Sequence, residues 1–342
     1  MKNSEYWKLR AEQAEKEMHE KSEKKEKEII EIYEKAKIEI DNKINIWYKR
    51  IAKNNSISFQ DAKKLLNKNE LKEFRWSIEE YIEKGKQNSI NSKWIKQLEN
   101  ASAKHHINKL ESIKIQLQAI AEETAQKIHK EIKDHVSDVF EEGCYKTAYD
   151  INVGTGICTG FEKIDKKMLE EVIYKPWALD GINFSSRIWA NKEKLIAEMH
   201  RQLSIMMING KPVPEISKEI SEKMNVPMSR AKNAVYTEAA YFYERGRKQA
   251  FDGLGVEKYR IVATWDIKTS DICQDMDGQE FYMHEYEVGV TAPPFHNYCR
   301  TTIAPEIDKA LLIGRAARDE NGKTIIVDAN MTYKEWKNKY VA

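Results

Sequence analysis

The sequence predicts a mainly α-helical protein, with a long helical N-terminal body and a small C-terminal mixed α/β module. Two observations favour this fold class. All seven prolines lie at or after Pro176 and residues 1–142 contain a single glycine, Gly85, so helix-breaking residues are concentrated in the second half. After Gly255 the chain changes to short stretches rich in β-branched and aromatic residues, which are typical of strands.

The composition excludes several classes of protein. The chain has 342 residues, which is long enough for two or three domains. Its 57 Lys and Arg and 55 Asp and Glu give a formal net charge of +2, so no overall field attracts it to DNA or to an anionic membrane. No segment has the roughly 20 consecutive apolar residues of a membrane span, and residues 1–20 lack the apolar core of a signal peptide. We therefore expect no membrane segment.

Residues 1–55 are predicted to form a helical arm that is partly exposed. From Lys8 to Glu28 charged and polar side chains dominate, so we expect this stretch to have no face to bury. Apolar residues then recur at steps of three and four, which predicts one packed face of a helix. These residues are Ile30, Tyr33, Ala36, Ile40, Ile44, Trp47 and Ile51.

Residues 56–228 are predicted to form a helical body with a glycine-rich break near 143–183. Short helices are expected between 58 and 90, where Ser58 and Ser77 each precede an acidic residue by three positions, as N-caps do. The longer helices are predicted from apolar spacing and from glycine and proline at their ends. They cover about 91–140, 185–209, 214–224 and 229–251, the last with Ser229 as its N-cap.

Residues 229–342 are predicted to form the mixed α/β module. Strands are expected at 259–265, 301–304 and 324–327. Asp277-Gly278 predicts a tight turn, and Pro293-Pro294 predicts an extended entry into a strand.

The module also contains the densest group of chemically distinctive residues in the chain. His296 and Cys299 are three positions apart, a spacing common in zinc sites, and Cys273 can supply a third donor. A fourth ligand is absent unless Asp275 or Asp277 provides it. Cys273, His296 and Cys299 are therefore candidate ligands of an incomplete zinc site. The alternative is that both thiols are buried as small apolar side chains and no metal is bound.

The same part of the chain also contains candidate residues for catalysis and for DNA binding. Cys299 beside His296 is a candidate nucleophile, but no glycine-rich oxyanion-hole loop accompanies it. Glu238 can act as an acid or base, although a salt bridge with Arg245 or an exposed face is the simpler interpretation. Basic stretches such as 245–248 have acidic residues close by, which favours a solvated surface over DNA binding. The tryptophans are interpreted as core or interface anchors.

The segment 263–307 resembles the signature module of the phage Mu F-like minor head proteins, also called phage head morphogenesis proteins. Upstream, Tyr236-Thr237-Glu238 is similar to the family's Arg-Thr-Glu helix motif, with tyrosine in place of arginine. Downstream, residues 315–336 resemble the tail of minor capsid proteins from phages and prophages of Gram-positive bacteria. The signature residues are Asp266, Thr269, Cys273, Met276-Asp277-Gly278, Pro293-Pro294-Phe295-His296 and Cys299-Arg300.

Many members of this family carry two further cysteines, which together with the cysteines that correspond to Cys273 and Cys299 can make a four-ligand zinc site. This chain has Ser270 and Thr301 at those positions. The resemblance therefore implies a zinc site that here lacks two thiolate ligands and retains Cys273, His296 and Cys299.

The resemblance also implies a function. We expect a minor capsid protein of a tailed bacteriophage that acts in procapsid assembly near the portal and is ejected with the DNA. It is expected in the virion interior, and in the host bacterial cytoplasm during assembly. The expected partners are the portal, scaffolding or major capsid protein, with genomic DNA as an alternative and no small-molecule substrate.

We expect no enzymatic activity. The alternatives are an injected effector enzyme, either a Cys-His hydrolase or a toxin-like transferase, and a DNA-binding module inside the head. Some relatives carry C-terminal toxin domains such as nucleases or ADP-ribosyltransferases, and we expect none after Ala342.

Overall fold

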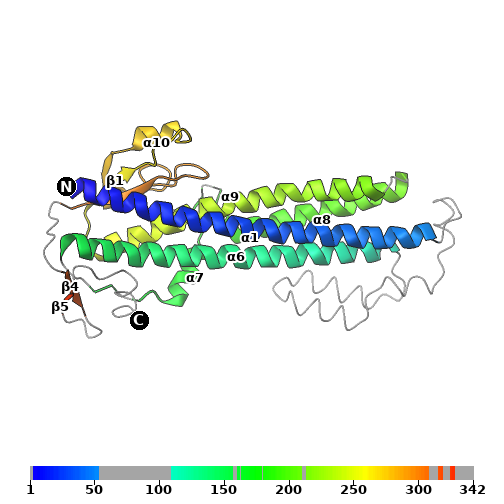
Figure 1. Cartoon of the computed structure of the whole chain (residues 1–342), viewed down its shortest axis with the longest axis horizontal. Helices are drawn as coiled ribbons and strands as arrows, with labels where there is room; N and C mark the ends of the chain where they lie inside the picture. The colour runs from blue at the N-terminus through cyan, green and yellow to red at the C-terminus, as the bar shows by residue number, and fades with distance from the viewer. Residues whose placement is uncertain are drawn as a thin grey trace. The chain divides into compact units, whose positions relative to one another are not determined.

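The protein is mainly helical with a small antiparallel sheet, as predicted (Figure 1). The computed structural model describes residues 3–53, 109–156, 160–161, 163–178, 180–209, 213–307, 315–318 and 324–327. The helices are α1 (Asn3–Lys53), α6 (Lys109–Thr155), α7 (Lys166–Tyr174), α8 (Phe184–Asn209), α9 (Val213–Gly253) and α10 (Asp271–Met276). The short helices expected between 58 and 90, with Ser58 and Ser77, lie outside the described residues. Within the described part of the chain, none of the helices is long and apolar enough to cross a bilayer.

The three-stranded sheet has the order β2-β1-β3, with both neighbours antiparallel to β1. Tyr259 in β1 lies opposite Phe281 on one side and Pro305 on the other. A two-stranded sheet follows, in which β4 pairs antiparallel with β5. The strands are β1 (Lys258–Val262), β2 (Glu280–Tyr282), β3 (Thr302–Glu306), β4 (Arg315–Arg318) and β5 (Thr324–Val327). All three predicted strands are confirmed, whereas β2 and β4 were not predicted.

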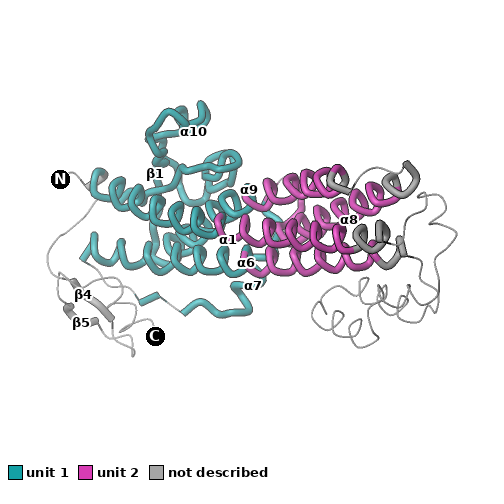
Figure 2. Tube along the Cα trace, turned by 45° about the vertical axis from the view of Figure 1, so that its right-hand side comes forward, with its two compact units in different colours: residues 1–26, 132–177, 233–342 teal, residues 27–131, 178–232 magenta. Residues whose placement is uncertain are grey.

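The chain divides into two compact units, coloured separately in Figure 2. Unit 1 comprises residues 1–26, 132–177 and 233–342, and unit 2 comprises residues 27–131 and 178–232. Both units combine segments that are distant in sequence, and α1, α6 and α9 contribute to both. The predicted divisions at residues 55 and 228 remain predictions, because these units are defined by contacts and not by continuous stretches.

The N-terminal half of α1 buries a face that the sequence did not lead us to expect. Trp7, Ala11, Ala14 and Met18 are all at most 5% exposed, so the expectation that residues 8–28 have no face to bury is wrong. Alanine contributes little to a hydrophobic pattern, yet its small side chain lets another helix approach closely. The face predicted after residue 30 is confirmed where it is described. It is formed by Ile29, Tyr33, Ala36, Ile40 and Ile44, with Ile29 in place of Ile30.

Two predicted helix boundaries are wrong for different reasons. Helix α6 continues through Gly143 to Thr155, because this glycine lies against the backbone of another helix instead of ending its own. The two helices predicted to meet near Pro227 form one helix, α9, with the proline inside it and Ser229 within it instead of capping it. Proline removes a single backbone hydrogen bond, a loss that packing along the rest of the helix outweighs. The predicted helix over 185–209 is confirmed as α8.

The core of unit 1 joins the sheet to the helices of that unit. Its buried residues come from α1, α6, α9 and strands β1 and β3. They are Trp7, Ala11, Ile151, Phe251, Val256, Tyr259, Ile261, Val262, Ile303 and Ala304. This apolar core supports the sheet, and the segments that follow β1 and precede β3 carry the candidate site.

Unit 2 is held by apolar helix faces and, among its described residues, by a buried ion pair. The Lys192 ammonium on α8 lies 2.9 Å from both carboxylate oxygens of Glu122 on α6, and both side chains are at most 3% exposed. Within the same unit His129 stacks on Phe184, with ring centroids 5.8 Å apart.

Candidate metal centre

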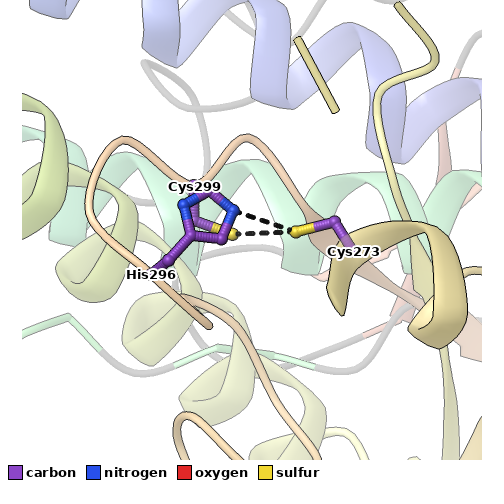
Figure 3. Close-up of side chains that lie close together, drawn as sticks. All are labelled: Cys273, His296 and Cys299. Carbon is purple, nitrogen blue, oxygen red and sulfur yellow. Dashed lines mark hydrogen bonds between the residues drawn. The ribbon is translucent and has the colours of Figure 1, made fainter. Parts of the chain in front are cut away.

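Three side chains from two segments of unit 1 converge on one point (Figure 3). Cys273 comes from α10, and His296 and Cys299 come from the turn that precedes β3. The Cys273 sulfur lies 3.2 Å from His296 Nε2 and 3.7 Å from the Cys299 sulfur. All three donor atoms lie within 4.8 Å of one another. The structure thus brings together the three residues that the sequence singles out.

The local backbone explains why these side chains meet. Ser270 is the N-cap of α10, and its hydroxyl accepts a hydrogen bond from the Cys273 amide, which fixes the first turn of this short helix. In the turn before β3, the Cys299 amide donates to the His296 carbonyl. Tyr298 between them has a φ of 59°, an unusual conformation for a residue with a side chain. Such conformations persist only where surrounding contacts hold them, and they concentrate at functional sites.

A backbone carbonyl fixes the orientation of the imidazole. His296 Nδ1 lies 2.7 Å from the Asn297 carbonyl oxygen, which can only accept a hydrogen bond, so Nδ1 carries the proton. In the neutral ring Nε2 then presents a lone pair toward Cys273 and toward the Ser270 hydroxyl, which lies 2.8 Å away. This arrangement is common for histidines that bind metals.

The two thiols are both buried, but their pKa values are shifted in opposite directions. Cys273 and Cys299 are 2% and 3% exposed. The hydrogen bond from the Cys299 thiol lowers the pKa of Cys273 to about 5, although burial opposes this change. Because Cys299 is the donor and is buried, its own pKa is raised. Thus Cys273 and not Cys299, the nucleophile considered from sequence, is the thiol whose ionised form is stabilised and which lies against the imidazole.

The three donors fit a zinc ion. Two thiolates on one tetrahedral zinc, each bound at about 2.3 Å, lie about 3.8 Å apart, and a thiolate and an imidazole nitrogen lie about 3.6 Å apart. The observed separations of 3.7 Å between the sulfurs and 3.2 Å between Cys273 sulfur and His296 Nε2 approach these values. The third pair, the Cys299 sulfur and His296 Nε2, lies within 4.8 Å, so a shift of up to about 1 Å in that pair would complete the fit.

Neither aspartate considered as a fourth ligand is part of the cluster. Asp277 accepts hydrogen bonds from the Ala263 amide at 2.8 Å and from the Trp265 indole at 2.9 Å, so its carboxylate ties the turn after α10 to the end of β1. Asp275 is exposed on α10 and does not belong to the group of converging donors. Gly278 has a φ of 79°, which confirms the tight turn predicted from Asp277-Gly278. Pro293-Pro294 lies in the loop before the site and not at a strand entry.

Hydroxyl groups lie where the resemblance implies the missing cysteines. The Ser270 hydroxyl contacts His296 Nε2, and the side chains of Ser270 and Thr301 both contribute hydrogen bonds that lower the pKa of Cys273. Both residues line a shallow pocket that also includes Thr264, Lys268, Thr269, Cys273, His296, Tyr298 and Arg300.

A salt bridge braces the loop that surrounds this pocket. Arg300 makes two hydrogen bonds, of 2.5 and 2.6 Å, to the Asp266 carboxylate. These bonds hold the pKa of Asp266 well below its usual range. On either side of Asp266 in the same loop, Trp265 is 74% exposed and Ile267 is fully exposed. The loop therefore presents two large apolar side chains on a rigid support.

A second group of polar residues in unit 1 was missed from sequence. Glu15 of α1 and Glu244 of α9 are buried, and burial raises the pKa of each to about 7. Glu244 accepts a hydrogen bond from Thr302 in β3, and Arg247 donates to the Ile303 carbonyl of the same strand. Glutamates in a charge-rich helix carry no sequence signal of burial. Only the surrounding fold reveals them.

Glu238, considered from sequence as an acid or base, has a structural partner. It is 5% exposed and accepts a hydrogen bond of 2.7 Å from the Trp177 indole. That indole stacks on Tyr241, with ring centroids 4.4 Å apart. These contacts anchor the segment after α7 to α9 within unit 1. Trp177 is therefore an anchor of the packed interior, one of the two roles predicted for the tryptophans, whereas Trp265 is exposed.

The site lies within a stretch of the chain that matches a known family. Residues 197–304, from the middle of α8 through β1, α10 and the Cys-His turn into β3, match the family model described as phage Mu protein F like protein. Over this segment, which is less than half of the chain, the protein is similar to the phage Mu protein F like family. The Mu F-like segment therefore contains all three converging donors, and the resemblance identified from the signature residues is confirmed.

A curated relative matches a longer stretch of the chain than the family model does. The NAD(+)--arginine ADP-ribosyltransferase EFV of Enterococcus faecalis is 23% identical to this chain over 189 residues, which is 54% of this chain and 38% of the relative. The chain thus spans less than half of that relative's length. No solved structure matches the chain.

Proposed function

We propose that this protein is a minor capsid protein of a tailed bacteriophage, which acts in procapsid assembly near the portal and is ejected with the DNA. The observation that carries the proposal is the family match over residues 197–304, because that family is named for a phage protein and the segment includes the module's sheet and site. The proposed partners are the portal, scaffolding or major capsid protein, and the proposed location is the virion interior.

The electrostatics of the helices favour contact with protein over contact with DNA. The basic stretch 245–248 is largely neutralised, because Arg247 is buried beside Glu244 and Lys248 pairs with Asp252 at 2.6 Å. DNA-binding surfaces instead leave several cations free to contact phosphates. The exposed Trp265 and Ile267 are the kind of anchor that protein interfaces use.

The proposal is tested in the assembling particle. The full chain is produced in bacteria with the portal, scaffolding and major capsid proteins of the same phage, and its copies per purified procapsid are counted by quantitative mass spectrometry. A fixed low copy number that disappears when the portal protein is omitted supports the proposal. Procapsids with no bound chain, or with an amount that varies freely with expression, contradict it.

The activity for which the Enterococcus faecalis relative is named defines a second candidate, an effector enzyme. Its test is transfer of ADP-ribose from NAD⁺ to an arginine-containing peptide by the purified chain. We expect none above a boiled control. For the DNA-binding alternative, we expect no salt-dependent binding to duplex DNA. A positive result in either assay would replace the assembly proposal.

A further inference from the structure

Three donor atoms lie close together: His296 Nε2 and the sulfurs of Cys273 and Cys299. The Asn297 carbonyl holds the proton on Nδ1, so the Nε2 lone pair faces the Cys273 sulfur. The Cys299 sulfur lies 3.7 Å from the same sulfur, on the side where the imidazole lies (Figure 3). One lone pair and two sulfurs that all lie within 4.8 Å of one another make a site for a cation that accepts soft ligands.

The frame around these donors is held independently of any ion. Ser270 caps α10, and the turn carrying His296 and Cys299 is closed by a backbone hydrogen bond and by the left-handed residue Tyr298. The thiols also pack with Ala263 and Phe295 in a small apolar cluster. Because the ligands are positioned by the fold, binding requires little rearrangement.

The fourth side of the site is lined by hydroxyl groups. Ser270 and Thr301 lie there, in the wall of the shallow pocket. Zinc in proteins is bound by thiolates, imidazoles and carboxylates, and a neutral hydroxyl is a poor substitute. The buried thiols and the imidazole can therefore occupy three positions of a tetrahedron, while the fourth faces the pocket.

We propose that Cys273, His296 and Cys299 bind one zinc ion and that the fourth coordination position is taken by water from the pocket. Ser270 is not a ligand; its hydroxyl caps α10 and lies beside the open position. The metal is therefore exchangeable, in contrast to a zinc held by four protein ligands. This inference concerns the module alone and does not depend on the proposed role in the phage head.

The first test counts the metal and its ligands. The full chain is purified under reducing conditions, loaded with zinc, desalted and analysed by mass spectrometry for metal. We expect about one zinc per chain for the native protein, for Ser270→Ala and for Cys144→Ser, a matched control whose buried thiol lies in α6 away from the site. Cys273→Ser and His296→Ala should retain none. His296 is only half-buried, so its loss keeps the measurement interpretable if a thiol variant fails to fold, as checked by circular dichroism.

The second test asks whether the fourth position is open. In the cobalt-substituted protein, the sulfur-to-metal charge-transfer absorption should correspond to two thiolates in the native chain and three in Ser270→Cys. Release of zinc to a chelator should be slower in Ser270→Cys than in the native chain by roughly tenfold or more. Loss of zinc in Ser270→Ala, or equal release rates in the native chain and Ser270→Cys, would show that the position is not open. A native chain that binds no zinc would overturn the site itself.

Discussion

Gly143 of α6 and Gly246 of α9 lie where the backbones of these two helices approach each other closely in unit 1. A Cβ atom added to Gly143 would lie 2.4 Å from the Tyr243 carbonyl oxygen, and one added to Gly246 would lie 2.3 Å from the Phe140 carbonyl oxygen. Both obstructing atoms belong to the backbone and cannot rotate away. The two glycines thus set the distance between the helices that support the sheet.

Substituting either glycine by alanine should therefore destabilise unit 1. We expect Gly143→Ala and Gly246→Ala each to lower the free energy of unfolding by about 1 to 3 kcal/mol, the usual effect of overpacking. Thermal and urea unfolding of the full chain measure this. Gly253→Ala is the control, since its Cβ would meet only the Phe161 ring at 3.5 Å. An equal loss of stability in all three variants would count against the packing argument.

Removing only one partner of the buried ion pair in unit 2 should lower the free energy of unfolding strongly. Lys192→Met leaves the Glu122 carboxylate buried without its main partner, so we expect a loss of about 3 to 5 kcal/mol. The double variant with Glu122→Leu should recover most of it. Lys218→Met, which removes the exposed pair with Glu222, should change stability by less than about 1 kcal/mol. If the double variant were as unstable as Lys192→Met alone, an unpaired charge would not be the cause.

The buried glutamates predict a pH dependence of stability. Burial raises the pKa of Glu15 and of Glu244 from 4.5 to about 7. The folded state therefore holds protons between pH 4.5 and 7 that the unfolded state has released, so this contribution to stability is complete below pH 4.5 and declines as pH rises through 7. The loss is on the order of 3 kcal/mol for each carboxyl group.

The measurement is urea unfolding at pH 5 and pH 8 for the native chain and for Glu15→Gln and Glu244→Gln. The difference between native and variant isolates the glutamates, because burial lowers the pKa of His19 and His200 and these contribute with the opposite sign. Each glutamine variant should be less sensitive to alkaline pH than the native chain. Identical pH profiles would show that the carboxyls are ionised throughout.

The loop that carries Trp265 and Ile267 is exposed, so a substitution in it tests the proposed assembly role. Ile267 is fully exposed, so Ile267→Asp should leave the unfolding free energy within about 0.5 kcal/mol of the native value. We expect fewer copies of this variant in purified procapsids. Ile38→Asp, at a residue that is 61% exposed in unit 2, is the control. Normal incorporation of Ile267→Asp would exclude this loop as a contact surface.

Periodic patterns predicted the parts of the fold that depend on large apolar residues. Tyr33, Ile40 and Ile44 were placed on a buried face because they recur at helical spacing, and they are buried. Ala11 and Ala14 were not, since alanine has too little apolar surface to mark a face. Gly143 indicated a helix end by residue type, whereas its role is to admit a neighbouring backbone.

The candidate site could be predicted only by its residue types. His296 and Cys299 followed from spacing, and Cys273 from being a thiol in the same module. The Asn297 carbonyl that orients the imidazole is a backbone atom and leaves no trace in the sequence. The Ser270 hydroxyl both caps α10 and contacts His296 Nε2. The second contact depends on the conformation of the loop, which the sequence pattern does not show.

Because unit 1 is built from three separate segments of the chain, it can be completed only late in synthesis. Unit 2 has all its segments once residue 232 has been made, but the first 26 residues contact strands that end at residue 306. At roughly 5 to 20 residues per second, the ribosome needs on the order of tens of seconds to bridge that interval. During that time Trp7 and Ala11 lack the buried neighbours that β1 and β3 supply. Nascent chains in this window should be the ones that chaperones bind and proteases cut.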